Sequence, residues 1–527
     1  MSPFDLGRAD QDAPPREAPA GPAPLTDTGN AERFATQHAG HVRYCYAQKT
    51  WYVWTGTHWQ ADLGDRIAQL AKETARSIYL EAAGLASEER RKATSQWAAK
   101  SEDERRRRAL VELARSEPGI PIAPEDLDRD LWLLNVANGT LNLRTGALAA
   151  HRREDYITRI IPIAYDPAAP CPIWEGFIRH ILSGKAAVIR FVQKALGYSL
   201  TGETREQVLF IFHGTGANGK TTLLETTSTL LAPYAAQVGA ETLLARETDA
   251  LALNDLFTLQ GRRFVVAIES DMGRRLAEAL VKRVTGSDTI KAKKLYTDVF
   301  AYRPTFKLFI ATNHKPVIRG TDHAIWRRIR LVKFDVVVPD DQQDKALPDK
   351  LKAELPGILR WTVDGCRLWQ SEGLGPPQEV RQATADYRAE MDTLGGFLLE
   401  RCWLEDPAAT VTAEDLYTDY DAWASRAKEK PLSMKAFATA LKERGLQAVR
   451  NKAGRAWVGI RLRSAMDPEP SAEPSAEPAV TDGDAFLGKL PHVGLAREVL
   501  GKTCHHPSPD TPEAPPSDCF DPPEGPR

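Results

Sequence analysis

The sequence predicts a mixed α/β protein with a parallel β-sheet at its core, flanked by a smaller folded unit on each side. Between residues 195 and 340, apolar runs of strand length alternate with helical patterns, which is typical of a parallel α/β sheet. A glycine-rich loop of the phosphate-binding type follows the first of these runs. Hydrophobic residues make up 42% and charged residues 27% of the 527-residue chain, which is enough for a large core.

An N-terminal α+β domain is expected over residues 28–190. Aromatic residues alternate at 51–54 before a Thr-Gly turn, and a second hairpin is expected around 141–148. Residues 63–116 have a helical and strongly charged pattern. We expect this charge run to be a solvated helix face, with DNA contact as the alternative. The aromatic cluster is expected to be core, with base stacking as the alternative.

Both ends of the chain, residues 1–27 and 464–527, are expected to be disordered. Six of the 36 prolines lie in residues 1–26 and thirteen in residues 464–527. Such segments bury too little apolar surface to offset the entropy of ordering them, and the C-terminal segment is also acidic. The cluster Cys504, His505, His506 and Cys519 lies there, but its spacing matches no zinc site.

Charge, cysteines and hydropathy exclude several classes of protein. The net charge of -2 excludes a uniformly basic nucleic-acid coat protein. No apolar stretch approaches the roughly 18 residues of a membrane helix, so no membrane partner is expected, and no signal peptide is visible. The six cysteines lack paired short spacing, which favours a reducing cytoplasm.

The phosphate-binding loop is the most informative motif. It follows a buried strand at 208–212 and precedes a helix at 222–231, the context that G-x-x-x-x-G-K-[ST] requires. Glycines allow backbone N–H groups to point at phosphate oxygens, Lys220 can reach the β and γ phosphates, and the Thr221 hydroxyl can bind Mg²⁺. The residues expected to bind the nucleotide are Gly214, Thr215, Gly216, Ala217, Asn218, Gly219, Lys220, Thr221 and Thr222.

Two polar residues that end neighbouring strands are candidates for catalysis. Glu269 ends the strand 264–268 and could activate the attacking water and share the metal, although such a residue can also simply cap a helix. Asn313 ends the strand 306–310 and could sense the γ-phosphate, although Asn is also common in turns.

An arginine cluster, Arg327, Arg328 and Arg330, follows a few residues later. The planar guanidinium group can clamp the phosphate charge of a transition state, and supplied by a neighbouring subunit it would act as an arginine finger. The alternative is a surface cluster that faces DNA or solvent.

A basic segment at residues 282–333 carries 13 Lys and Arg against 3 acidic residues. Alternation within it predicts a β-hairpin with a basic, aromatic-bearing arm that could follow a DNA strand by charge and stacking. A subunit interface or the rim of the nucleotide pocket is the alternative. The candidate DNA-binding residues are Lys291, Lys293, Lys294 and Tyr296.

Together these motifs resemble a superfamily 3 helicase, and specifically the helicase part of the phage/plasmid primase–helicase family. The resemblance covers about residues 28–340. In the α/β segment the resemblance rests on Gly214–Thr222, Phe264–Glu269, Val284–Asp288 with the basic hairpin, Phe306–Asn313 and Gly320–Arg330. Upstream it rests on Asn30–Arg33, Trp51–Trp59 and Leu134–Gly146, which resemble the family's N-terminal helicase-associated region.

The resemblance implies an AAA+-like P-loop NTPase domain over residues 191–390, a hexameric ring, and ATP-driven translocation on single-stranded or forked DNA during replication. It further implies that Lys220 and Thr221 bind ATP and Mg²⁺, that Glu269 activates water, that Asn313 is the sensor, and that Arg328 is the first choice for the finger. The family often has two adjacent acids where Ser270 here separates Glu269 from Asp271, so the choice of metal ligand stays open. Only about 27 residues precede the matching region, so we expect no primase domain and a separate primase or polymerase as a partner.

A last unit, residues 395–463, is expected to be a winged-helix-like domain. Its pattern is a helix over 413–428, a helix over 434–444 capped by Ser433, and a hairpin at 447–458. DNA contact and protein docking are both open for it, and the basic candidates are Lys435, Lys442, Arg450 and Lys452.

The motifs and this resemblance therefore predict an ATP-dependent replicative DNA helicase of phage or plasmid origin, acting as a ring in the cytoplasm of a bacterial or phage-infected cell. Two alternatives remain: an initiator that binds origin DNA and uses ATP as an assembly switch with little unwinding, and an RNA-directed or packaging ATPase.

Overall fold

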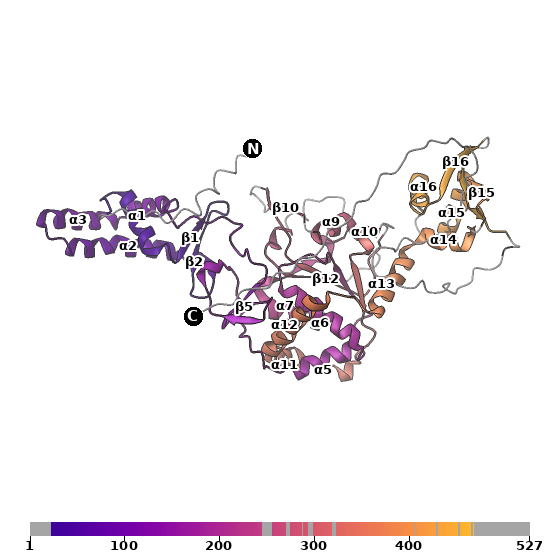
Figure 1. Ribbon diagram of the computed structural model, residues 1–527, viewed down its shortest axis with the longest axis horizontal. Helices are drawn as coiled ribbons and strands as arrows, with labels where there is room; N and C mark the ends of the chain where they lie inside the picture. Colours follow the sequence, from indigo (N-terminus) through magenta and orange to yellow (C-terminus); the bar gives the residue numbers. More distant parts are fainter. Residues whose placement is uncertain are drawn as a thin grey trace, which may run out of the picture. The chain divides into compact units, whose positions relative to one another are not determined.

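The computed structural model describes residues 23–244, 256–269, 275–286, 288–293, 299–318, 323–404, 406–427, 431–451, 454–464 and 467 (Figure 1). The chain divides into two compact units, Met1–Thr393 and Leu394–Arg527. The boundary expected at residue 190 falls inside helix α6, Ala186–Leu200, so the sheet and the segment before it share one helix. Most of both expected disordered ends lies outside the described residues.

The first unit begins with two small antiparallel sheets and a group of charged helices. The three-stranded sheets run β1-β2-β3 and β4-β5-β6. Thr26 caps α1 and Ser87 caps α3 through their side chains, which fixes where these helices begin. The elements are α1 (Asp27–His38), β1 (Val42–Cys45), β2 (Thr50–Trp54), β3 (Trp59–Ala61), α2 (Arg66–Ala83), α3 (Glu88–Ser101), α4 (Glu104–Ala114), β4 (Leu133–Val136), β5 (Gly139–Asn142) and β6 (Ala147–Ala149).

The predicted strand at 51–54, the charged helices and the second hairpin are therefore confirmed. The aromatic cluster is core only in part: Tyr44 and Trp59 are buried, the aromatic residues of β2 are half-buried, and Tyr46 is 53% exposed. Arg105 and Arg108 lie on α4 in solvent-exposed positions, as expected for a solvated helix face.

The centre of the first unit is a five-stranded parallel sheet in the order β13-β7-β12-β9-β8. This confirms the predicted parallel α/β sheet. The strands are β7 (Leu209–His213), β8 (Ala235–Gly239), β9 (Phe264–Glu269), β12 (Lys307–Thr312) and β13 (Ile329–Lys333). β8 and β13, the two edge strands, were not singled out in the sequence.

Alternate residues of the central strands bury the two faces of this sheet. Phe210 and Phe212 of β7 pack in one core with helices α5, α6, α7 and α12, whereas Leu209 and Ile211 pack in a second core with α9, α10 and α13. The helices are α5 (Pro172–Ile181), α6, α7 (Lys220–Leu231), α9 (Glu278–Val284), α10 (His323–Trp326), α11 (Leu347–Ala353), α12 (Leu355–Glu372) and α13 (Gln378–Met391). Helices cover both faces of the sheet, so the ends of its strands are the part that a ligand can reach.

The predicted basic hairpin is confirmed as an antiparallel pair of strands. β10 (Ile290–Lys293) pairs with β11 (Val299–Tyr302), with Lys293 opposite Val299. Ile290 and Tyr302 are buried in the second core, which fixes the base of the hairpin to the sheet.

The second unit has its own core, in which Phe397, Tyr420 and Phe437 pack together. Its helices and strands are α14 (Thr393–Arg401), β14 (Cys402–Trp403), β15 (Thr410–Thr412), α15 (Ala413–Arg426), α16 (Met434–Glu443), β16 (Gln447–Asn451), β17 (Gly454–Val458) and β18 (Arg461–Leu462). The two predicted helices, the Ser433 cap and the hairpin are confirmed, and β15 adds a third strand to that hairpin.

Among the described residues, every helix is too short or too polar to span a bilayer.

Candidate nucleotide-binding site

Three neighbouring strands of the parallel sheet end at the same level. In the pairing register, Thr312 of β12 lies opposite His213 of β7 on one side and opposite Glu269 of β9 on the other. The carboxyl ends of these strands thus form one edge, the usual place for a ligand in an open α/β sheet. The glycine-rich loop leaves this edge after His213, and Asn313 leaves it after Thr312.

The loop from Gly214 to Gly219 joins β7 directly to α7. Gly216, Ala217 and Gly219 all have positive φ angles, of 110°, 47° and 78°, so the loop turns tightly before the helix begins at Lys220. This curvature directs backbone N–H groups toward one point, which is what a phosphate group requires. The unpaired N–H groups of the first turn of α7 add to the positive potential.

Gly214 is required by a close approach. A Cβ at this position would lie 2.3 Å from the Asn218 Nδ2 atom and 2.4 Å from the Phe334 carbonyl oxygen. The side chain of Asn218 donates to that same Phe334 carbonyl at 3.4 Å, and the Ala217 carbonyl accepts from Val338 N at 2.8 Å. The segment that follows β13 therefore contacts the loop through hydrogen bonds at Phe334 and Val338.

Lys220 lies at the centre of the site. Its ammonium group donates to the Gly214 carbonyl at 2.7 Å, to Asn218 Oδ1 at 2.8 Å and to Asn313 Oδ1 at 3.2 Å. The residue is 4% exposed, and its burial lowers the pKa of the amine to about 8. The loop and the strand end at Asn313 thus hold one desolvated cation between them.

A pocket of about 250 Å³ opens next to this lysine. Asn313 and Thr221, which line it, are both exposed. Its walls come from the glycine-rich loop, the start of α7 and the ends of two strands: Gly216, Ala217, Asn218, Gly219, Lys220, Thr221, Thr222, Ile268, Ala311, Thr312 and Asn313. Except for Gly214 and Thr215, the pocket therefore brings together all the residues predicted to bind the nucleotide, along with Asn313.

The acidic candidates are placed only in part. Glu269 is the last residue of β9, one residue beyond Ile268 in the pocket wall. Ser270 and Asp271 lie outside the described residues, so the choice between the two acids stays a prediction. Within the described part of the chain, no three His, Cys, Asp or Glu side chains gather as a metal site. Bound Mg²⁺ would take its remaining ligands from the nucleotide and from water.

The arginine cluster lies at the other edge of the sheet. Ile329 of β13 pairs with Leu209, the first residue of β7, so Arg327 and Arg328 precede the strands at the end remote from the glycine-rich loop. Arg327 is exposed, whereas Arg328 is 8% exposed and donates to the Ala324 carbonyl at 2.5 Å. Arg330 is half-buried and donates to the Arg327 carbonyl at 2.8 Å.

Both Arg327 and Arg328 also donate to one side-chain oxygen, Gln207 Oε1, at 2.7 and 3.4 Å. Gln207 is not predicted from the sequence. A lone glutamine before a strand carries no pattern, and its partners lie 120 and 121 residues away.

Two of the DNA-binding candidates, Lys291 and Lys293, belong to strand β10. Lys294 and Tyr296 lie outside the described residues, as does Lys452 of the second unit.

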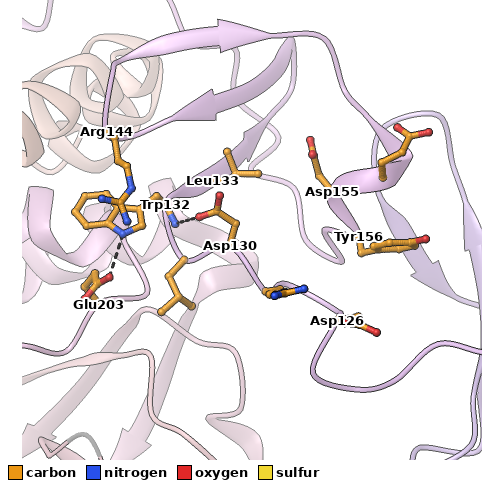
Figure 2. A pocket seen from close by; sticks show the side chains of 11 residues that line it. Asp126, Asp130, Trp132, Leu133, Arg144, Asp155, Tyr156 and Glu203 are labelled. Carbon is orange, nitrogen blue, oxygen red and sulfur yellow. Dashed lines mark hydrogen bonds between the residues drawn. The ribbon is translucent and has the colours of Figure 1, made fainter. Parts of the chain in front are cut away.

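A larger pocket, of about 600 Å³, shares no residue with the one beside Lys220 (Figure 2). Figure 2 shows Arg144 lying over the ring of Trp132, 4.2 Å from its centroid, while the Trp132 indole donates to Glu203 at 3.0 Å. Its lining is Asp126, Arg129, Asp130, Leu131, Trp132, Leu133, Arg144, Glu154, Asp155, Tyr156 and Glu203.

Comparison with known families finds two matches along the first unit. Residues 31–183 match the family described as "D5 N terminal like", and residues 212–328 match a family of unknown function, DUF5906. The second match begins in β7 and ends at Arg328, so it includes the glycine-rich loop, Glu269, Asn313 and the hairpin.

Relatives with similar sequences come from large DNA viruses. A candidate helicase of Frog virus 3 is 29% identical over 48% of this chain and 28% of its own length. A candidate helicase of Acanthamoeba polyphaga mimivirus is 25% identical over 56% of this chain and 33% of its own length. A candidate primase of African swine fever virus is 25% identical over 57% of this chain and 34% of its own length. The chain thus matches about a third of the length of these relatives.

Among solved structures, the C-terminal region of NrS-1 aligns with a TM-score of 0.46 at 10% identity, covering 81% of this chain and 98% of that one. The two family matches and the viral relatives together support a phage or viral primase–helicase family for this chain.

Proposed function

We propose that this chain is an ATP-driven DNA helicase motor of viral or phage replication, with a P-loop NTPase core of AAA+-like type. The observation that carries the proposal is the convergence on one pocket of the glycine-rich loop, Lys220 and Asn313, beside the strand end that bears Glu269. Each of these groups has a role in phosphoryl transfer from ATP to water.

The residues of the pocket fit a nucleotide triphosphate with its metal. Lys220 already faces three oxygen acceptors, so a phosphate oxygen would replace acceptors of the same kind. The exposed Thr221 would bind Mg²⁺ through its hydroxyl, together with Glu269 or a neighbouring acid. Bound Mg²⁺ would neutralise charge on the β and γ phosphates.

In this proposal Glu269 orients and activates the water, and Asn313 senses the γ-phosphate. Asn313 contacts Lys220 through the amide oxygen, so binding of a phosphate to the lysine would release that oxygen. Because Asn313 directly follows β12, the change would pass to the sheet and to the segments at its other end.

An arginine acting in trans completes the proposed site and requires an oligomer, for which we propose a hexameric ring. β7 spans five residues, about 16 Å at roughly 3.3 Å per residue, so Arg327 cannot reach the nucleotide of its own loop. Its exposure favours Arg327 over the buried Arg328 for contact with a neighbouring copy.

The proposed track for DNA is the β10–β11 hairpin, with Lys291 and Lys293 of β10 as the contacting residues. We further propose that the second unit is winged-helix-like and adds DNA contacts through Lys435, Lys442 and Arg450. A separate primase or polymerase is the proposed partner.

The test is strand separation on a forked duplex with ATP and Mg²⁺, for wild type and for Lys220→Ala. The proposal predicts unwinding by the wild type alone. If both proteins bind the fork and assemble but leave it paired, the proposal fails and an ATP-switched initiator takes its place.

A further inference from the structure

One short segment, residues 201–207, lies between helix α6 and strand β7 and ends at the arginine cluster. Its last residue, Gln207, accepts hydrogen bonds from Arg327 Nη2 at 2.7 Å and Arg328 Nη2 at 3.4 Å. Arg327 is exposed, and this bond uses only one of the five N–H donors of its guanidinium group. Within the part of the chain that the structure describes, this is the one hydrogen bond of the Arg327 side chain, so its other donors are available to a phosphate.

The backbone of Gln207 is held in an uncommon conformation. Its φ angle is 50°, in the left-handed region that residues other than glycine rarely adopt, and its N–H donates to the Thr204 carbonyl at 3.0 Å. Such strain persists only where the surroundings fix it, and it clusters at functional positions.

The surroundings of the segment 201–207 do fix it, from three sides. Lys307, at the start of β12, donates to the Glu203 carbonyl at 3.3 Å and also to the Thr201 carbonyl. Trp369 of α12 donates through its indole to Glu206 Oε1 at 2.7 Å.

The third side is the N-terminal part of the first unit. The Gly202 N–H donates to the Leu131 carbonyl at 2.9 Å, and Trp132 holds the Glu203 carboxylate at the wall of the larger pocket (Figure 2). Gln207 therefore cannot shift without breaking several hydrogen bonds of this segment, and the oxygen that it offers to the arginines has a fixed place.

We propose that Gln207 is a positioning residue that holds Arg327 for contact with the nucleotide of a neighbouring copy of this chain. The inference rests on the proposed ATPase function and names the residue that prepares the arginine for it. Preorganisation of this kind matters because a displacement of about 1 Å at a reacting group can cost about a hundredfold in rate.

The variant that tests this is Gln207→Gly, because glycine adopts a φ of 50° without strain and lacks the acceptor. We expect kcat for ATP hydrolysis to fall about 10- to 100-fold with KM for ATP unchanged and the melting temperature equal or higher. Combined with Arg327→Ala, Gln207→Gly should cause no further loss of kcat, because both changes disable the same group.

A second experiment mixes subunits of two variants, Gln207→Gly and Lys220→Ala. Gln207→Gly subunits have an intact loop, and Lys220→Ala subunits have an intact Gln207 and Arg327, so mixed assemblies should hydrolyse ATP faster than either variant alone. Wild-type kcat in Gln207→Gly, a loss that adds to that of Arg327→Ala, or no recovery on mixing would overturn the inference. Wild-type hydrolysis that persists in Lys220→Ala would instead overturn the proposed function, so the two failures are distinguishable.

Discussion

The ammonium group of Lys220 lies 3.2 Å from the side-chain oxygen of Asn313, although 93 residues separate them in the chain. The contact exists because β7 and β12 are adjacent parallel strands whose ends align at His213 and Thr312. It joins the predicted phosphate-binding lysine to the predicted sensor before any nucleotide is bound.

The first prediction concerns this pair. Asn313→Ala removes a group that would act on the γ-phosphate or the water, so kcat for ATP hydrolysis should fall about 100-fold, the scale measured for single polar groups in transition-state sites. Because Lys220 keeps its loop contacts, ATP affinity should change little. Steady-state hydrolysis and nucleotide titration measure the two effects. Asn313→Asp is the matched variant: its charge should pair with Lys220 and weaken ATP binding itself.

The second prediction is a pH dependence of ATP affinity. The pKa of Lys220 is lowered to about 8 by burial, and the charged form binds phosphate. The charge is present below pH 8 and is lost as the pH rises through 8, so affinity should be constant up to about pH 7 and roughly tenfold weaker at pH 9. Lys220→Arg keeps its charge throughout this range and should show a flat profile. The same decline in both proteins would exclude Lys220 as its cause.

The third prediction tests the close approach at the loop. Gly214→Ala would place a methyl group 2.3 Å from Asn218 and 2.4 Å from the Phe334 carbonyl, so the loop must shift and ATP binding should be lost. Gly176, in helix α5, is the control, because a Cβ there meets nothing within 4 Å. Gly176→Ala should leave binding intact and stabilise the fold by about 0.5–1 kcal/mol. Fluorescent nucleotide titration and thermal unfolding distinguish the two. Equal binding by both variants would contradict the role given to this loop.

The fourth prediction concerns the hairpin. If Lys291 and Lys293 each neutralise one phosphate of single-stranded DNA, the double Ala variant should reduce the slope of log K against log salt by about 1.4, or roughly 0.7 per contact. Lys345→Ala, outside the basic segment, should leave the slope unchanged. A weaker affinity with the wild-type slope would assign the hairpin to a subunit interface instead.

The sequence predicts the local parts of this site better than their assembly. The motif around Lys220 is contiguous, so the strand, the loop and the helix can be predicted together, and the strand and the helix are confirmed. The order of the strands depends on pairing between distant segments, so the position of β13 beside β7 could not be predicted. For the same reason the hydrogen bond between Asn218 of the loop and the Phe334 carbonyl, just after β13, could not be predicted. Gln207 was missed for the same reason, since its function depends on partners that only the folded sheet brings close.

The fifth prediction concerns the second unit. Its core is separate, with Phe437 and Tyr420 stacked at 4.6 Å between ring centroids, so residues 394–467 should fold alone in a single cooperative transition. Phe437→Ala should cost about 3–5 kcal/mol and unfold this fragment, whereas Lys435→Ala, on the same helix but exposed, should not. Circular dichroism during thermal unfolding measures both. A wild-type fragment without a transition would contradict the autonomy of this unit.

The most direct test of the central claim is ATP hydrolysis measured with and without single-stranded DNA, for wild type and for Lys220→Ala. A DNA-coupled motor should hydrolyse ATP several times faster when DNA is present, and Lys220→Ala should abolish hydrolysis under both conditions. Hydrolysis that ignores DNA, or that survives the loss of Lys220, would contradict the account.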